Sequence, residues 1–438
     1  MSDYMFMLEN HLTSQQSRVV ADVEAAAAAA SVNLFLTGGA IRDMLGGFAV
    51  RDLDFTVEGP AIKLAKTVAH ETGAEIVQTD DNRKCVQMLF PGGVTVEIGM
   101  ARQERYAKPG SKPHVTPATI HEDLRGRDFT LNALALSLNR ASRGLLLDPT
   151  NGSSELERKE LRATGNYTLY DNPIRLFRLI RFQVRFGFQI AERTQLQYEN
   201  ARAAGVEKYI APRALFEELA HAASEANPGD VIEAYEREKL LLLVSPALAG
   251  AKLNLQGFAK LQKAKQLLPF GVDLHTDNVS LFFNLLTENL SPKEKSAMVK
   301  AIAMERSELD AAQRLEAKAH KLEKELQSAK LQKASALYDL LSKAPGELIL
   351  FLLVKSGQRL VQDRIRNYLQ KYLPMAQEVT DNDVIEAGGT LGTPKFEKMK
   401  EQIIARKLNS RPKKVPPPAE TEAPAPAMAH NHPARRGG

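Results

Sequence analysis

The sequence predicts an α+β protein, with a mixed N-terminal domain followed by a long series of helices. From about 31 to 150, short runs rich in β-branched and aromatic residues alternate with helical segments. After about 151 the strand signals nearly vanish, and helical periodicity continues to about 407. A chain of 438 residues is too long for a single core, so two to four domains are expected.

The N-terminal domain is expected to begin with helix over residues 1–30, since this segment ends in an alanine run and alanine is the best helix former. The next helix is predicted at 61–72, and strands are predicted at 75–79 and 85–90. The turn Pro91-Gly92-Gly93 then leads into a strand at 94–98, which suggests a hairpin.

Asp52 and Asp54 are the most informative feature of this domain. They lie two residues apart at a predicted strand, so their side chains project to the same face. Two adjacent carboxylates repel each other unless a hard cation such as Mg²⁺ lies between them. The alternative is an acidic pair on a solvated strand edge.

A glycine pair precedes these acids, between a predicted strand and the start of a helix. Gly38 and Gly39 allow backbone N–H groups to approach an anion at the helix start, and Arg42 follows about one turn later. A phosphate cradle beside a two-carboxylate metal site is what nucleotidyl transfer requires.

Two further features follow in the same domain. Glu97 is a third candidate catalytic carboxylate, on a strand that could pair beside the acidic pair, although an exposed edge charge is the alternative. The polar segment Arg102 to Lys112 is expected to be a mobile loop, either a linker or a lid over a nucleotide.

The segment 122–135 joins charged and amide side chains to a helical apolar run. Arg127 could neutralise a triphosphate, and Asn132 could hold a ribose or phosphate oxygen. A capped helix with a surface ion pair explains these residues equally well.

A helix rich in arginine is predicted after Pro173, which suits a first helical turn, with Asp171 or Asn172 as its cap. Its arginines fall within about 120° of one face and have no acids interleaved, so an anion is expected opposite them. They are Arg175, Arg178, Arg181 and Arg185. A bound nucleotide would supply that anion, and ion pairs with acids elsewhere are the alternative.

Together these segments resemble the class II tRNA nucleotidyltransferases, which include bacterial CCA-adding enzymes and bacterial poly(A) polymerases. The resemblance covers roughly residues 31–220. The motifs that carry it are Gly38 to Asp43, Asp52-Leu53-Asp54, Arg127 to Ala133, Asp148 to Gly152, and Arg175 to Phe182.

The resemblance implies a nucleotidyltransferase head with a mixed β-sheet, followed by all-helical domains. The implied units are the head at 1–150, a base-selecting neck at 151–225, a body at 226–310, an RNA-binding tail at 311–407 and a disordered Pro/Ala-rich end at 408–438. Basic candidates in the tail are Lys395, Lys398, Lys400 and Arg406.

The resemblance also implies roles for the site residues. Asp52 and Asp54 would hold Mg²⁺ as catalytic residues. The candidate nucleotide-binding set is Gly38, Gly39, Arg42, Arg127, Asp128, Asn132, Asn172, Arg175, Arg178 and Arg181.

The implied activity is template-independent addition of C and A, from CTP and ATP, to the 3′ end of tRNA. Poly(A) synthesis and partial CC or A addition are the nearest alternatives, and a non-catalytic RNA-binding relative is the third. The sequence departs from the family where Asn172 replaces the usual aspartate and Gly126 replaces an arginine. An amide oxygen can still accept a hydrogen bond from a base amine, but the bond is weaker.

Composition sets the remaining expectations. Hydrophobic residues make up 44% and charged residues 25%, as in ordinary soluble proteins. No apolar run reaches the roughly 18 residues of a membrane span, and no secretory signal is apparent, so a cytoplasmic protein with no membrane association is expected. The single cysteine excludes an internal disulfide, and the net charge of +5 is compatible with nucleic acid as a partner. No obligate protein partner is evident.

Overall fold

The structure, a computed structural model, describes residues 3–269, 271–272 and 274–410. Its N-terminal part is built on a seven-stranded mixed sheet of order β3-β4-β5-β2-β1-β8-β9. The strands are β1 (Asn33–Thr37), β2 (Leu53–Glu58), β3 (Glu75–Asp80), β4 (Cys85–Leu89), β5 (Thr95–Met100), β8 (Ala135–Ser137) and β9 (Leu146–Leu147). β2 pairs with β5 in parallel and with β1 in antiparallel, so the strand that carries Asp54 and directly follows Asp52 lies in the middle of the sheet.

The helices of this part are α1 (Asp3–His11), α2 (Ser14–Ala29), α3 (Gly39–Leu45), α4 (Ala61–Thr72) and α5 (Ile120–Arg125). The predicted helix at 61–72 is confirmed, and the predicted strands end within one residue of β3 and β4. The helix predicted over 1–30 is instead divided in two, because the Thr13 side chain and Gln16 form a capping box that starts α2.

The prediction of a loop from Arg102 to Lys112 is wrong for residues 102–105, which form a strand of a β-hairpin. Strand β6 (Arg102–Arg105) pairs in antiparallel with β7 (His114–Pro117). Ion pairs from Arg83 and Arg102 to the Glu104 carboxylate, at 3.1 and 3.0 Å, support the hairpin. Because the strand is held by polar contacts, it carries no alternating apolar pattern from which it could be predicted.

Beyond residue 151 the described chain is almost entirely helical, as predicted, apart from the two-residue strands β10 (Glu160–Leu161) and β11 (Gln189–Ile190). Its first helices are α6 (Gly152–Arg158), α7 (Thr168–Asp171), α8 (Arg175–Phe186), α9 (Glu192–Ala203), α10 (Pro212–Ala223) and α11 (Pro228–Arg237). Then follow α12 (Leu255–Lys265), α13 (Asn278–Thr287), α14 (Pro292–Ala301), α15 (Arg306–Leu326), α16 (Ala334–Ser342), α17 (Gly346–Lys355), α18 (Arg359–Asn367), α19 (Leu373–Gln377), α20 (Asp381–Glu386) and α21 (Pro394–Asn409).

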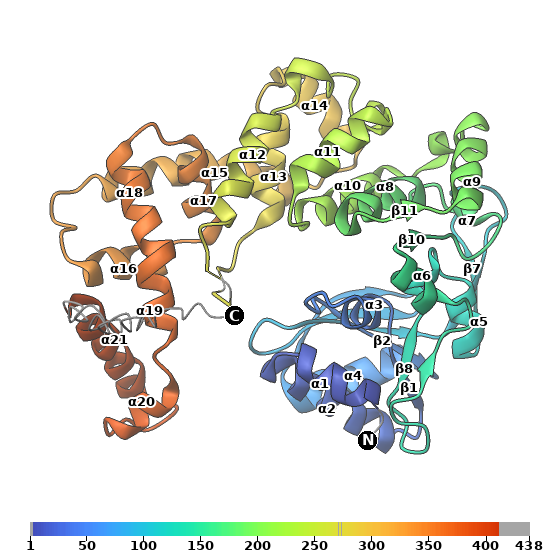
Figure 1. Ribbon diagram of the computed structural model, residues 1–438, viewed down its shortest axis with the longest axis horizontal. Helices are drawn as coiled ribbons and strands as arrows, with labels where there is room; N and C mark the ends of the chain where they lie inside the picture. The colour runs from blue at the N-terminus through green and yellow to red at the C-terminus, as the bar shows by residue number, and fades with distance from the viewer. Residues whose placement is uncertain (1–2, 270, 273, 411–438) are drawn as a thin grey trace, which may run out of the picture.

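The described part of the chain forms an arch (Figure 1). The sheet and α1 to α5 form one end, α8 to α13 form the top, and α18 to α21 form the other end. None of the helices in the described part is both long and apolar enough to cross a bilayer.

Two boundaries differ from the sequence prediction. Helix α8 begins at Arg175 without a side-chain cap, since Asp171 belongs to the preceding α7 and the Asn172 side chain bonds elsewhere. The tail predicted to be disordered from 408 begins inside helix α21, which ends at Asn409. Residues 411–438 of that prediction lie outside the described part of the chain.

Candidate active site

Three carboxylates gather at the start of β2 and on the neighbouring β5. Asp54 lies directly opposite Glu97 in the parallel β2–β5 register. Asp52 precedes β2, is exposed, and accepts a hydrogen bond of 3.0 Å from the Thr95 hydroxyl. The strand that holds Glu97 therefore does pair beside the acidic pair, as the sequence predicted.

The half-buried Asp54 carboxylate is in an unfavourable electrostatic environment. Burial, followed by the negative charges of Glu97 and Asp52, raises its pKa to about 7, although Arg127 and Arg42 act in the opposite direction. A cation placed among the three carboxylates would relieve this repulsion.

The glycine pair lies against these carboxylates. Gly38 has a φ of 64°, which favours glycine, and a Cβ there would lie 3.0 Å from Arg127 Nη1 and 3.6 Å from Asp54 Oδ2. A Cβ on Gly39 would lie 3.5 Å from Arg42 Nη2 and 3.9 Å from Asp54 Oδ2. The start of α3 thus brings backbone N–H groups, two guanidiniums and a carboxylate into one small region.

Side-chain hydrogen bonds hold the cationic groups in place. Arg42 donates to Asn132 Oδ1 at 2.6 Å and pairs with Asp43 at 2.8 Å. Arg127 donates to Asp123 Oδ2 at 2.9 and 3.0 Å and to the Thr56 hydroxyl at 3.0 Å. The polar groups are therefore already oriented, a condition that favours electrostatic catalysis.

Asp128 connects this head site to α8. Its Oδ2 accepts a hydrogen bond of 2.7 Å from Arg178 Nη1, and its Oδ1 accepts one of 2.9 Å from Asn132 Nδ2. Burial alone would raise the pKa of Asp128, but the charges of Arg178 and Arg175 and these hydrogen bonds hold it well below its usual range. Asp128 is thus an ionised internal partner that orients an arginine and an amide.

Asn172 and Arg175 lie on the α8 side of the same region. Asn172 Nδ2 donates to the Tyr106 hydroxyl at 3.4 Å, and that hydroxyl donates to Glu104 at 2.6 Å. The Nε of Arg175 is buried and has no hydrogen-bond partner among the described residues. The β6–β7 hairpin therefore reaches the predicted base-selecting position.

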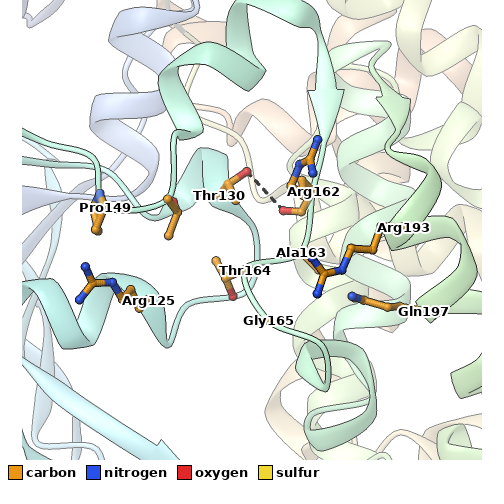
Figure 2. Close-up of a pocket in the computed structure, with 10 residues that line it drawn as sticks. Arg125, Thr130, Pro149, Arg162, Ala163, Thr164, Gly165, Arg193 and Gln197 are labelled. Atoms are coloured by element: carbon orange, nitrogen blue, oxygen red, sulfur yellow. Dashed lines mark hydrogen bonds between the residues drawn. The ribbon is translucent and has the colours of Figure 1, made fainter.

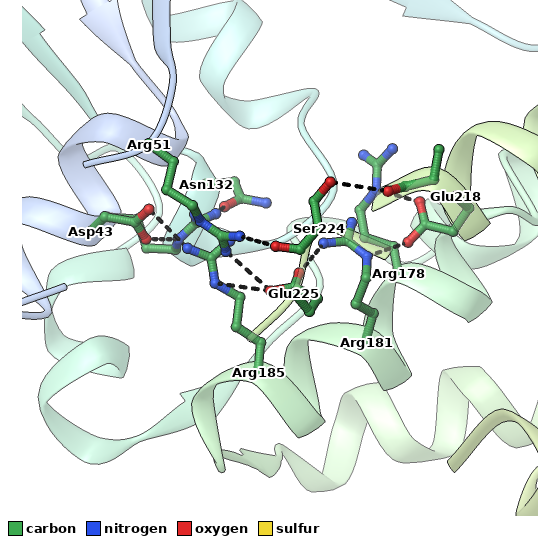
Figure 3. Close-up of polar contacts among 11 residues, drawn as sticks. Asp43, Arg51, Asn132, Arg178, Arg181, Arg185, Glu218, Ser224 and Glu225 are labelled. Carbon is green, nitrogen blue, oxygen red and sulfur yellow. Dashed lines mark hydrogen bonds and ion pairs between the residues drawn. The ribbon is translucent and has the colours of Figure 1, made fainter. Parts of the chain in front are cut away.

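The Arg181 guanidinium is not a free cation, because it is engaged in ion pairs with Glu218 and Glu225 (Figure 3). Its side chain is only 7% exposed, and it pairs with Glu218 at 2.7 Å and with Glu225 at 2.8 Å. Arg185 pairs with Asp43 at 2.9 Å. For these two arginines the structure favours the ion-pair alternative over the predicted nucleotide contact.

Sequence reasoning missed the acids that complete these networks, namely Asp43, Asp123, Glu218 and Glu225. Arg51 was also missed. It donates to the Ser224 carbonyl and to Glu225 and so joins the head to the end of α10. Asp43 and Asp123 lie within motifs already considered. Glu218 is on α10 and Glu225 lies just after its end, in a segment that carries no recognisable signal.

Asp52 and Asp54 supply carboxylate oxygens, which are ligands that Mg²⁺ prefers. In the described part of the chain, no three or more His, Cys, Asp or Glu side chains form a group that could hold a metal ion by themselves. Mg²⁺, however, is usually bound through one or two carboxylates together with substrate phosphates, rather than by an all-protein cage. Asp52 and Asp54 beside a phosphate cradle fit that mode of binding.

Comparisons with known proteins agree with this geometry. Residues 34–162 match the poly A polymerase head domain family. The chain is 28% identical to an A-adding tRNA nucleotidyltransferase of Halalkalibacterium halodurans, over 88% of each chain. It is 26% identical to the A-adding tRNA nucleotidyltransferase of Geobacter sulfurreducens, over 93% of this chain but 47% of that protein, so it spans about half of that relative's length.

A solved tRNA nucleotidyltransferase, complexed with a primer tRNA and an incoming ATP analog, has a similar fold. The TM-score is 0.52 and the identity 26%, with 80% of this chain and 98% of that chain covered. The predicted resemblance to the tRNA nucleotidyltransferases and bacterial poly(A) polymerases is therefore confirmed, by the head domain at residues 34–162 and by the relatives matched along most of the chain.

Proposed function

We propose that this protein is a Mg²⁺-dependent, template-independent nucleotidyltransferase that adds C and A, from CTP and ATP, to the 3′ end of tRNA. The observation that carries the proposal is the meeting of Asp54 and Glu97 with Gly38 and Arg127 at the middle of the sheet. Negative groups for a cation and positive groups for a triphosphate lie side by side there.

Asp52 and Asp54 would hold Mg²⁺, which when bound supplies charge to activate the RNA 3′ hydroxyl and to offset the leaving pyrophosphate. The backbone at Gly38 and Gly39 would receive phosphate oxygens at the start of α3. Arg42 and Arg127 would balance the triphosphate charge, and their hydrogen bonds to Asn132 and Asp123 keep them oriented.

The base would be read from the α8 side. Asn172 would accept a hydrogen bond from the base amine through Oδ1, because its Nδ2 already donates to Tyr106. Arg175 and Arg178 would lie beside the nucleotide, with Arg178 held by Asp128. Glu97 remains a candidate third carboxylate next to Asp54.

The second candidate is addition of the terminal A alone. It is favoured by the names of three relatives matched over 77–93% of this chain, all of which are A-adding enzymes. Poly(A) synthesis is the third candidate, because the matched head domain carries that name.

The test incubates the purified protein and Mg²⁺ with tRNAs that end at the discriminator base or at CC, supplying CTP, ATP or both. Sizing the products at single-nucleotide resolution separates the candidates. Two additions with CTP and a third that needs ATP are expected. Extension of only the CC-ending tRNA, by one A, would replace the proposal with A addition, and a long adenosine ladder would replace it with poly(A) synthesis.

Two variants test whether the transfer activity comes from this site. Asp52→Asn should abolish transfer while RNA binding is retained, and Asp81→Asn, which changes an exposed turn residue, should be normal. Full activity in Asp52→Asn would refute the assignment of the carboxylates. No extension of either tRNA by wild-type protein would refute the proposed function.

A further inference from the structure

A cavity of about 300 Å³ lies between the end of α5 and the 3₁₀ helix Thr130–Asn132 on one side and α9 on the other (Figure 2). None of the residues assigned above to nucleotide transfer lines it. The side chains used in the following argument are Arg125, Thr130, Thr150, Arg162, Arg193 and Gln197.

The cavity carries excess positive charge. Its lining includes three arginines and no carboxylate. Arg162 pairs with the buried Glu155 at 2.5 Å and is thereby neutralised. The remaining two cations, Arg125 and Arg193, are exposed and lie on opposite sides of the cavity. Arg193 donates to the uncharged Asn166, so its positive charge is not cancelled by that contact.

Two buried atoms of uncharged polar side chains in the lining lack hydrogen-bond partners within the described part of the chain. They are Thr150 Oγ1 and Gln197 Oε1. An unpaired buried polar group costs about 1–3 kcal/mol, so a ligand that supplies the missing partner is favoured. The threonine hydroxyl can donate to an acceptor, and rotation of the glutamine amide presents its NH₂ group in the same way.

We propose that this cavity binds a phosphate group. A phosphodiester offers only acceptor oxygens, and inorganic phosphate at neutral pH offers mainly acceptor oxygens, which matches two guanidiniums and two further donors. The phosphate is either a phosphodiester of the RNA backbone or free inorganic phosphate, and both present anionic acceptor oxygens. This inference goes beyond the proposed function, because it assigns a second anion site away from the reacting groups.

The cavity is joined to the active site through the backbone. The Thr164 hydroxyl, in the cavity lining, donates to the carbonyl of Arg127, and the Thr130 amide donates to the Arg162 carbonyl at 2.9 Å. A phosphate held between Arg125 and Arg193 would link the end of α5 to α9 and restrain these two helices relative to each other. Occupancy would therefore reduce the movement of α9 relative to the segment that carries Arg127 and Asn132.

The experiment compares the full-length wild-type protein with Arg125→Ala/Arg193→Ala. Both arginines are exposed, so the double variant should fold, and its circular dichroism checks this. Thr150→Val is a second variant that removes one hydroxyl at nearly constant volume. Arg18→Ala, at an exposed position on α2, is the matched control. Binding of inorganic phosphate is measured by the rise in Tm when phosphate replaces chloride at constant ionic strength. Binding of tRNA lacking its 3′ terminus is measured by fluorescence anisotropy.

We expect the double variant to lose at least about tenfold in affinity for one of the two probes, because two charge-assisted contacts are removed. Thr150→Val should weaken binding of the same probe, and Arg18→Ala should bind both probes as wild type does. Weaker tRNA binding identifies an RNA phosphodiester as the ligand, and weaker phosphate binding alone identifies free phosphate. If the double variant binds both probes as the control does, the proposal is overturned. Because transfer is not the readout, this result is independent of the activity test.

Discussion

At the scale of single residues, Asp54 shows how the site is prepared for a cation. Its pKa is raised to about 7 by burial and by Glu97 and Asp52, so the metal-free folded protein holds a proton that the unfolded chain releases near pH 4. Between these two values the folded state binds more protons, and the free energy of unfolding falls as the pH rises. The contribution of this group is therefore present at low pH and is lost as the pH passes through about 7.

Asp54→Asn should remove that pH dependence. With EDTA present, we expect the variant to be about 1–3 kcal/mol more stable than wild type at pH 8, because it lacks the disfavoured charge. The difference should shrink at pH 5. Transfer should fall by about a thousandfold or more if Asp54 holds Mg²⁺. Urea unfolding at both pH values and primer extension provide the measurements, with Asp81→Asn as control. A variant less stable than wild type at pH 8 would show that Asp54 is not under electrostatic strain.

The local part of the candidate site could be predicted from the sequence, because short spacings determine it. Gly38 and Gly39 lie at one strand–helix turn, and Asp52 and Asp54 lie two residues apart. The partners of the arginine helix could not be predicted in this way. Glu218 is 37 residues from Arg181, and Asp43 is 142 residues from Arg185. Periodicity identifies the charged face of a helix but not which acids the fold brings to it.

At the scale of elements, α8 is fixed by buried ion pairs as well as by its apolar face. Arg181→Ala would leave Glu218 with the longer contact of 3.6 Å to Arg178 and would remove one partner of Glu225. Removing one member of such a buried network typically costs about 3–5 kcal/mol. We expect a loss of this size in the free energy of urea unfolding at pH 7.

Arg359→Ala is the control for that variant, because the Arg359 side chain is 95% exposed and pairs with Asp363 at 3.8 Å. It should change the stability by less than about 1 kcal/mol. Unchanged stability in Arg181→Ala, together with weaker nucleotide binding, would instead support the role that the sequence predicted for Arg181.

The β6–β7 hairpin is an element that the sequence did not predict, yet Tyr106 in its connecting loop contacts Asn172, which lies between α7 and α8. Tyr106→Phe would leave the Asn172 amide free to rotate. If Asn172 reads the base, discrimination between CTP and ATP should fall by about fivefold, the value of one neutral hydrogen bond. Single-nucleotide kcat/KM values for both substrates measure this, and Tyr167→Phe, which removes an exposed hydroxyl, is the control. Unchanged discrimination would contradict this role of Tyr106.

At the scale of the whole molecule, the arch separates the carboxylates from α21 at its other end (Figure 1). The division into a sheet-based head and a helical remainder could be predicted, since strand and helix periods differ. The arch itself could not, because it depends on how each helix packs on the next. A long RNA that reaches both ends would contact α21 while its 3′ end lies at the head.

The exposed cations of α21 allow a test of that arrangement. Lys395, Lys398 and Arg406 are exposed, whereas Lys400 pairs with Asp381 at 2.7 Å. Replacing the three exposed cations by alanine should weaken tRNA binding and reduce the slope of log K against log salt by about 2, because each phosphate contact contributes roughly 0.7–0.9. The rate of nucleotide addition at saturating tRNA should not change, since the reacting groups lie in the head. Lys63→Ala/Lys66→Ala on α4, which also removes exposed cations, should leave the slope as in wild type. An unchanged slope in the α21 variant would mean that the RNA does not reach this end of the arch.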